Sequence, residues 1–255
     1  MRTVGLMIPV LLLHVGAAAP AASQADATRG GARFGVAATW SGLVDRNASA
    51  LHYQGPGAGA GIGWRGVYDN SRFDISLTAS ASRLSSRITA GRANRESALN
   101  TELRLAALRR LASLSNGGLS TFAGGQVLLS GLGRQHNFSN ATETFADLFG
   151  TLSATGMWEY QGRDLIVSGT VALPIVSVVG RTPYYGLKTA PELRLRGPLS
   201  LSMLTHTLRV ERPVTPRLTV LMDYRTTLQR DDDPRSIRRI EHWLGMGVEL
   251  RRGAR

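Results

Sequence analysis

The one constellation in this chain that could carry hydrolysis is a histidine followed three residues later by a serine. His136 and Ser139 lie in the polar segment His136–Asn140. A histidine that acts as general base can activate a serine hydroxyl for nucleophilic attack. On a strand, however, side chains three residues apart point to opposite faces, so the base would not reach the hydroxyl. The spacing therefore favours a solvated polar loop over an active site.

Cofactor and metal chemistry are not indicated by the remaining polar residues. The chain has no cysteine, which excludes disulfides and thiolate metal sites. The histidines His52, His206 and His242 are isolated from one another and show no metal-ligand spacing. The acidic run Asp231–Asp233 could hold calcium, but such a run is more typical of a solvated loop tip. We therefore expect no cofactor and no metal.

The chain is strongly basic, and its base is almost entirely arginine. It has 30 Lys and Arg against 18 Asp and Glu, a net charge of +12, and Lys188 is the only lysine. The arginines are spread along the sequence, which argues against a nucleic-acid partner for an exported protein. Arginine binds phosphate in a bidentate manner, so lipopolysaccharide phosphates are the expected partner. A genomic bias toward arginine would explain the same composition.

The N-terminus has the layout of a secretory signal peptide. Met1-Arg2 precedes the apolar run Val4–Leu13, and the small residues Gly16–Ala22 follow. This order is typical of a signal peptide, whereas a membrane-spanning helix would need about 20 apolar residues. We predict a signal peptide over residues 1–25 and one mature domain over 26–255.

Apolar and small polar residues alternate with period two through the mature region, which indicates β-strands with two different faces. In residues 72–83 the apolar residues take odd positions from Phe73 and the polar residues take even positions from Asp74. Residues 105–111 could instead be helical, because Leu, Ala and Arg favour helix. The segments that follow the alternation are 33–43, 57–69, 72–83, 97–111, 119–132, 144–160, 163–173, 199–210, 217–228 and 237–250.

Long and short connections alternate between these segments. Short turns at one end, long loops at the other and an even strand count are typical of outer-membrane barrels. No later segment is apolar enough for a spanning helix, so a membrane-embedded domain must be a closed barrel. The fold class is therefore predicted as all-β, a closed antiparallel up-and-down transmembrane β-barrel of about ten strands. The long connections are 44–56, 84–96, 133–143 and 174–198.

Two features predict a filled barrel mouth. Alternate glycines from Gly55 to Gly63 mark an inward face where a neighbouring side chain or an inserted segment needs space. The apolar segment 174–198 is the candidate insert, and we expect it to fold into the mouth or to pack over it. Alternatively, it contains an eleventh and a twelfth strand.

The two faces of the strands predict a lumen and a lipid surface. Charges of both signs on the small polar face would fill a narrow lumen with ion pairs: Arg65, Asp74, Glu102, Arg104, Asp147, Glu159, Asp223 and Arg225. Aromatic residues near strand ends predict a girdle at the membrane interfaces: Trp40, Trp64, Tyr68, Phe73, Trp158 and Tyr160.

With these features the chain resembles the outer-membrane β-barrel proteins of Gram-negative bacteria as a class, from Arg33 to Arg251. It departs from them at its end, Arg251–Arg255, where these proteins usually have an aromatic residue. The resemblance implies a location in the cell outer membrane, with outer-membrane lipid and lipopolysaccharide as partners. We expect a non-enzymatic structural or interaction role, or a narrow pore. The alternatives are a phospholipid or lipid A hydrolase using His136 and Ser139, and a soluble secreted β-sandwich.

Overall fold

The computed structural model describes most of the mature chain. The predicted signal peptide lies outside the described residues and stays a prediction. Ser139, Asp232 and Asp233 lie outside them too. Among the described residues there is no helix of the length and apolarity that crossing a membrane requires. The described ranges are 29–46, 49–68, 70–87, 93–114, 118–137, 142–181, 192–197, 201–231 and 236–251.

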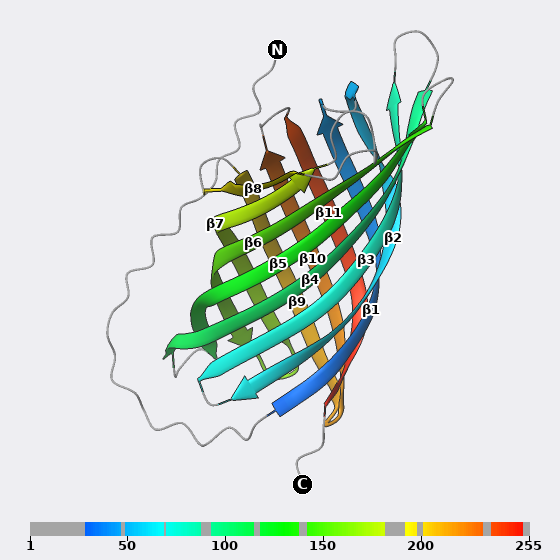
Figure 1. Cartoon of the computed structure of the whole chain (residues 1–255). Coiled ribbons are helices and arrows are strands. Elements are labelled where there is room, and N and C mark those ends of the chain that lie inside the picture. Colours follow the sequence, from blue (N-terminus) through cyan, green and yellow to red (C-terminus); the bar gives the residue numbers. More distant parts are fainter. Residues whose placement is uncertain are drawn as a thin grey trace, which may run out of the picture.

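Ten long strands close into an antiparallel barrel (Figure 1). Consecutive strands pair from β1 to β7, β7 pairs with β9, and β11 returns to β1. The predicted all-β barrel is confirmed, and the β-sandwich is wrong because a single sheet closes on itself. The strands are β1 (Arg29–Asp45), β2 (Ser49–Tyr68), β3 (Ser71–Arg87), β4 (Ala93–Leu114), β5 (Leu119–Asn137), β6 (Thr142–Gln161), β7 (Ile166–Arg181), β8 (Glu192–Arg196), β9 (Leu201–Thr215), β10 (Leu218–Asp231) and β11 (Ile237–Arg251).

The short strand β8 shares one place in the ring with β9. β8 pairs with Ser177–Arg181, the second half of β7, whereas β9 pairs with Ile166–Ala172, its first half. Both strands run antiparallel to β7. β8 and β9 together therefore form one interrupted wall strand, and the barrel remains ten-membered.

The prediction that segment 174–198 enters the barrel mouth is wrong for its described part. Residues 174–181 belong to β7 and residues 192–196 form β8, so both lie in the wall. Leu193 and Leu195 are more than 70% exposed on the outer face. Their apolar character is therefore explained by the outer surface of the barrel and not by a plug. Residues 182–191 lie outside the described residues.

We call the end of the barrel where the longer connections lie the loop end. Most strands extend further than predicted at this end. β2 begins at Ser49 rather than at residue 57, and β3 continues to Arg87. Pairing persists there, for example between Ser85 and Arg95. The outer face is polar in these parts and the inward face carries apolar residues such as Tyr53 and Leu84, so the pattern of the belt disappears while the backbone hydrogen bonds continue. The predicted loops 44–56 and 84–96 are therefore largely strand.

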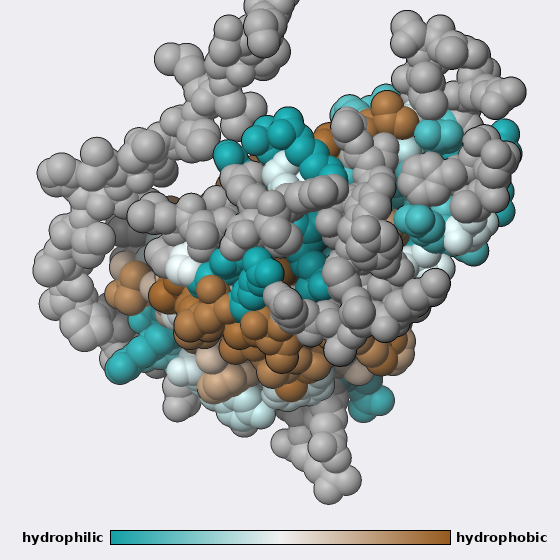
Figure 2. Space-filling model, turned by 45° about the horizontal axis from the view of Figure 1, so that its top comes forward, coloured by the Kyte–Doolittle hydropathy of each residue, from teal (hydrophilic) through white to brown (hydrophobic). Residues whose placement is uncertain are grey.

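An apolar belt covers the outer face of the barrel. Val36 on β1 and Met246 on β11 are more than 60% exposed. Figure 2 shows hydrophobic residues around the barrel and hydrophilic residues gathered at the end above them. A continuous apolar surface of this kind marks contact with lipid or with a partner.

Polar side chains replace the apolar ones on the outer face of β2 to β6 near the loop end. We call this part the raised wall. At ~3.4 Å per residue and a tilt of ~40°, residues 82–87 of β3 add roughly 15 Å of wall above the belt. The exposed polar residues of the raised wall are Gln54, Arg83, Ser85, Arg95, Ser97, Gln135, Asn137 and Thr144.

Glycines on the inward face of β2 make room for larger side chains. A Cβ on Gly59 would lie 2.4 Å from the ring of Trp243, and a Cβ on Gly57 would lie 2.5 Å from Thr39 Oγ1. The prediction that these glycines give space to a neighbouring side chain is confirmed. At Gly59 the neighbour is Trp243 of β11 and not the 174–198 segment.

Candidate functional site in the lumen

The charges that the alternation assigns to the lumen face inward on five of the strands: β2, β3, β4, β6 and β10. They lie in a register that alternates with exposed apolar residues, as the pleat of a strand requires. Residues as distant in sequence as Arg65 and Glu211 meet inside, with Nη2 and Oε1 separated by 2.7 Å. The eight are Arg65, Asp74, Glu102, Arg104, Asp147, Glu159, Asp223 and Arg225, and each of them is buried or half-buried.

A basal cluster of ion pairs lies near the short-turn end of the barrel. Arg33 contacts both Glu249 and Asp74, each at 2.7 Å. Arg65 reaches Glu211 although β2 and β9 are four places apart in the ring. These pairs therefore tie opposite parts of the wall together. The cluster consists of Arg33, Arg65, Arg72, Asp74, Glu159, Glu211 and Glu249.

A middle cluster crosses the full width of the lumen. Glu102 on β4 forms an ion pair with Arg225 on β10 at 3.0 Å, and these strands are five places apart in the ring of ten. The Asn100 side chain lies between Glu102 and the ion pair of Arg239 with Glu241. The Glu102–Arg225 contact therefore joins diametrically opposite strands at this level.

An upper cluster closes the lumen near the loop end. Arg134 contacts Asp45 and Asp147, each at 2.6 Å, and Arg181 contacts Asp45 at 2.8 Å. Glu96 lies 3.9 Å from Arg134. All five side chains are buried. Because Asp45 is on β1 and Arg181 is on β7, this cluster also joins opposite walls.

His136 lies inside the lumen next to the upper cluster. Its Nε2 is 2.9 Å from the hydroxyl of Tyr53, and its Nδ1 is 3.3 Å from Glu96. The ring is fully buried. A lipid hydrolase would need its histidine at the outer face, where the acyl chains lie, and His136 points the other way. Ser139 lies outside the described residues.

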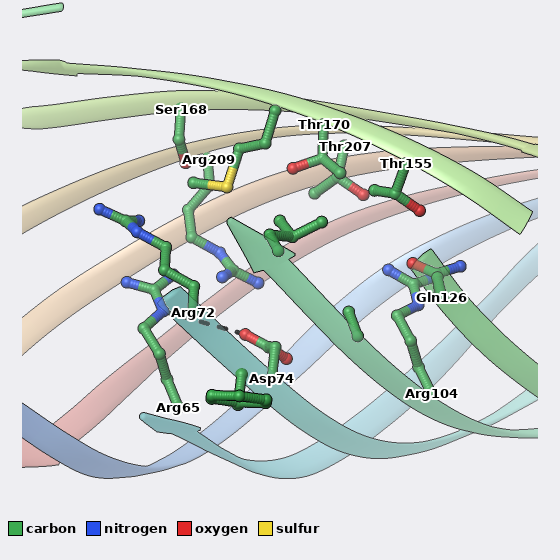
Figure 3. Close-up of a pocket in the computed structure, with 14 residues that line it drawn as sticks. Arg65, Arg72, Asp74, Arg104, Gln126, Thr155, Ser168, Thr170, Thr207 and Arg209 are labelled. Atoms are coloured by element: carbon green, nitrogen blue, oxygen red, sulfur yellow. Dashed lines mark ion pairs between the residues drawn. The ribbon is translucent and has the colours of Figure 1, made fainter. Parts of the chain in front are cut away.

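A chamber lies between the basal and middle clusters. It has two adjoining parts, of ≈ 70 Å³ and ≈ 100 Å³, which share Asp74, Arg104, Thr207 and Arg209. Figure 3 shows the first part, with arginines and short hydroxyl side chains directed into it from both sides. The other polar residues of the first part are Arg65, Arg72, Gln126, Thr155, Ser168 and Thr170.

The six aromatic residues assigned to a girdle lie on the outer face. Trp158 and Tyr160 are more than 40% exposed near the short-turn end, and Trp40 is similarly exposed toward the loop end. Trp64 is less exposed because its indole lies against Gly30 and Gly66. The remaining pair, Tyr68 and Phe73, makes an edge-to-face contact with ring centroids 5.8 Å apart.

A second aromatic group on the outer face includes a histidine. Trp40 is the register partner of His242. A hydrogen bond of 2.7 Å joins Tyr224 Oη to His242 Nδ1, and the two rings stack. An amphipathic group of this kind suits a membrane interface, where one edge is apolar and the other is wet.

No group of three or more potential metal ligands occurs within the part of the chain that the structure describes. Asp231, the first residue of the acidic run, is buried and faces Arg196 at 3.5 Å. His52 and His206 are exposed on the outer face. The expectation of no metal site stays a prediction, because Asp232 and Asp233 lie outside the described residues.

The lumen also contains charged residues that the sequence analysis did not assign to it. Several of them lie in segments that were predicted as loops, where the apolar outer face has ended. Continuing the period-two count past those ends would have placed them inward, since strand pairing continues. They are Arg33, Asp45, Glu96, Arg134, Arg181, Arg209, Glu211 and Arg239.

Comparison with known proteins supports the fold alone. No protein-family model matches the chain, and no curated protein matches it. The outer-membrane protease OmpT from Escherichia coli matches over 91% of this chain and 99% of its own, with 11% identity and a TM-score of 0.56. The β domain of the Bordetella autotransporter BrkA matches over 87% of this chain and 98% of its own, with 10% identity and a TM-score of 0.44. The likeness to OmpT, together with the closed ring, shows that this chain has an outer-membrane β-barrel fold.

Proposed function

We propose that this protein is exported to the cell outer membrane and serves there as a sealed barrel with a structural or interaction role. The observation that carries the proposal is the bridging of opposite walls. Asp45 meets Arg181 across the lumen, and Glu102 meets Arg225 at a second level. Ten strands enclose a lumen that side chains can fill, whereas open aqueous channels belong to wider barrels.

The raised wall is the proposed interaction surface. Its polar outer face begins where the apolar belt ends, so it would stand outside the lipid. Arg83 and Arg95 lie there on neighbouring strands. Guanidinium groups at this height suit the phosphates of lipopolysaccharide. Outer-membrane lipid would surround the belt below, and no nucleic acid is expected.

A narrow pore is the second candidate. The chamber supports a pore, because hollow space interrupts the packing of side chains between the basal and middle clusters. Conduction would require the ion pairs above and below the chamber to separate. The inward position of His136 does not favour the hydrolase alternative.

Cysteine labelling tests the proposal, because the native chain has no cysteine that could react. Three single variants on β3 sample three environments: Ser85→Cys on the raised wall, Ala79→Cys on the apolar belt and Ser80→Cys in the lumen. Intact cells are treated with a membrane-impermeant maleimide. We expect labelling of Ser85→Cys alone. After denaturation all three variants should react, which controls for expression.

Two outcomes would overturn the proposal. Labelling of Ser80→Cys on intact cells would mean that the lumen is open to water from the outside. Protection of Ser85→Cys would mean that the raised wall is not outside the cell. Planar-bilayer recordings provide the second readout: the sealed barrel gives no steady conductance, and an ohmic current from the unmodified protein would favour the narrow pore.

A further inference from the structure

The chamber has an unusual balance of charge for an enclosed space. Its two parts are lined by Arg33, Arg65, Arg72, Arg104, Arg209 and Arg225 and by two carboxylates, Asp74 and Asp223. Arginine stays protonated in proteins, so these cations cannot lose their charge to reduce the cost of burial. Each of them therefore needs a carboxylate, water or a bound anion.

Four of the six arginines have a carboxylate within 3.0 Å. Arg33 and Arg65 pair with Glu249 and Glu211 in the basal cluster. Arg72 pairs with Glu159, and Arg225 pairs with Glu102. The positive charges of these four arginines are compensated by four glutamates that do not themselves line the chamber.

Arg104 and Arg209 are the exceptions among the described residues that line the chamber. The nearest carboxylate to Arg104 is Glu102 at 4.0 Å, and Glu102 is already engaged by Arg225. The Nε and Nη2 atoms of Arg104 are buried without a hydrogen-bond partner. Arg209 has no carboxylate within 4.0 Å in the described part of the chain, and its Nε is likewise buried without a partner.

These two arginines approach the first part of the chamber from different walls. Arg104 projects from β4 and Arg209 from β9, and the two strands are four places apart in the ring. Asp74 is the one carboxylate that lines this part, and it is paired with Arg33 at 2.7 Å. Asp223 lines only the second part.

The first part has the donors and the size that a small anion needs. Its volume of ≈ 70 Å³ exceeds the ~10–15 Å³ that a single water requires. Hydroxyl groups from Thr155, Ser168, Thr170 and Thr207 and the amide of Gln126 line it besides the arginines. Guanidinium groups hold tetrahedral oxyanions through paired hydrogen bonds, and hydroxyls complete such a site.

We propose that the chamber binds a small tetrahedral oxyanion, of the size of inorganic phosphate or sulfate, between Arg104 and Arg209. The anion supplies the negative charge that the protein does not place there, and it accepts hydrogen bonds from the guanidinium nitrogens that have no protein partner. This site does not depend on whether the barrel is sealed or conducting.

Calorimetric titration of the detergent-extracted full-length barrel tests the proposal. The protein is titrated with sodium phosphate, sodium sulfate or sodium chloride at equal ionic strength. We expect saturable binding of phosphate or sulfate and none of chloride. Arg209→Gln and Arg104→Gln should each weaken this binding about tenfold or more, because each removes charge-assisted hydrogen bonds.

Arg110→Gln is the matched control. Arg110 also points inward and also has a buried Nε without a hydrogen-bond partner, but it lies over the ring of Phe122 and does not line the chamber. Oxyanion binding should be unchanged in this variant. A heat-dependent shift in electrophoretic mobility establishes that each variant is a folded barrel. If an arginine variant does not fold, Thr207→Val takes its place in the test. This substitution removes a hydroxyl donor of the same site.

Each result of the titration leads to a different conclusion about the chamber. Binding of both anions supports a general oxyanion site, and binding of one alone identifies the ligand. The absence of saturable binding to the unmodified protein overturns the proposal. Equal weakening by Arg110→Gln overturns it as well, because the effect would then reflect net charge and not the chamber.

Discussion

The upper cluster and the chamber use the same residue types in the same lumen, with opposite results. In the upper cluster two arginines and three carboxylates form ion pairs of 2.6–3.9 Å, and all five side chains are buried. In the chamber Arg104 and Arg209 face hollow volume. A filled lumen therefore needs charges of opposite sign at the same height along the barrel axis. Charges of both signs on the inward face are not sufficient.

The wall residues explain why the chamber stays hollow. Where the upper cluster packs, long side chains reach across from β5 and β7 to meet carboxylates. Around the chamber the inward positions of the wall are often short, as at Thr207, Thr170 and Ser168, and Gly61 and Gly63 leave further space. Side chains of this length cannot reach the centre of a ten-stranded barrel.

Removing Arg134 from the upper cluster should have the largest effect on the stability of the barrel. Arg134→Ala leaves Asp45, Asp147 and Glu96 buried without their main counter-charge, so we expect a loss of ~3–5 kcal/mol in the free energy of unfolding. Chemical denaturation in lipid vesicles, followed by tryptophan fluorescence, measures it. Arg110→Ala is the control, since Arg110 has no carboxylate within 4 Å among the described residues. Similar stabilities for the two variants would contradict the role of the upper cluster.

A pair of substitutions on β9 tests the difference in packing directly. Thr205 is buried, whereas Thr207 lines the chamber two residues later on the same face. Thr205→Leu should destabilise the barrel by ~1–3 kcal/mol, because it forces extra volume into a packed region. Thr207→Leu should cost less than ~1 kcal/mol, because the chamber accepts the added atoms. Denaturation midpoints measure both variants, and equal costs would show that the chamber is not hollow in the membrane.

The smallest expected effect concerns Arg209 in the absence of an anion. Because Arg209 has no carboxylate within 4.0 Å among the described residues, Arg209→Gln should change the free energy of unfolding by less than ~1 kcal/mol in phosphate-free buffer. Added phosphate should then stabilise the unmodified protein by up to ~2.7 kcal/mol at a hundredfold excess over the dissociation constant. At the same phosphate concentration a variant that binds tenfold more weakly should gain no more than ~1.4 kcal/mol. A large destabilisation of the variant without phosphate would mean that Arg209 has a structural partner.

Much of the fold follows from the alternation of side chains along the chain. All ten predicted segments are strands, including residues 105–111, for which helix was an alternative. The largest errors lie at the loop end of the barrel. There the outer face leaves the apolar belt, so residues such as Ser85 and Gln135 carry no hydropathy signal although their backbones remain paired.

The same limit explains what was missed in the lumen. Asp74 and Glu102 could be assigned inward because apolar neighbours flank them on their strands. Asp45, Glu96 and Arg134 lie beyond the last lipid-facing residues, and they were read as loop. The upper cluster, which the proposed function depends on, combines such positions with Asp147, which the sequence did assign inward.

Within the predicted segments, the residue pattern alone indicates which face most side chains occupy, because side chains alternate along the pleat of a strand except at bulges such as the one at Arg110/Ala112. Only the tertiary structure decided which charges meet. Arg65 and Glu211 are 146 residues apart in sequence, yet they bond across the lumen. Their meeting depends on the tilt and stagger with which the strands close, and these are properties of the whole ring. The same closure left Arg209 with no carboxylate within 4.0 Å among the described residues, and Arg104 with only Glu102, at 4.0 Å.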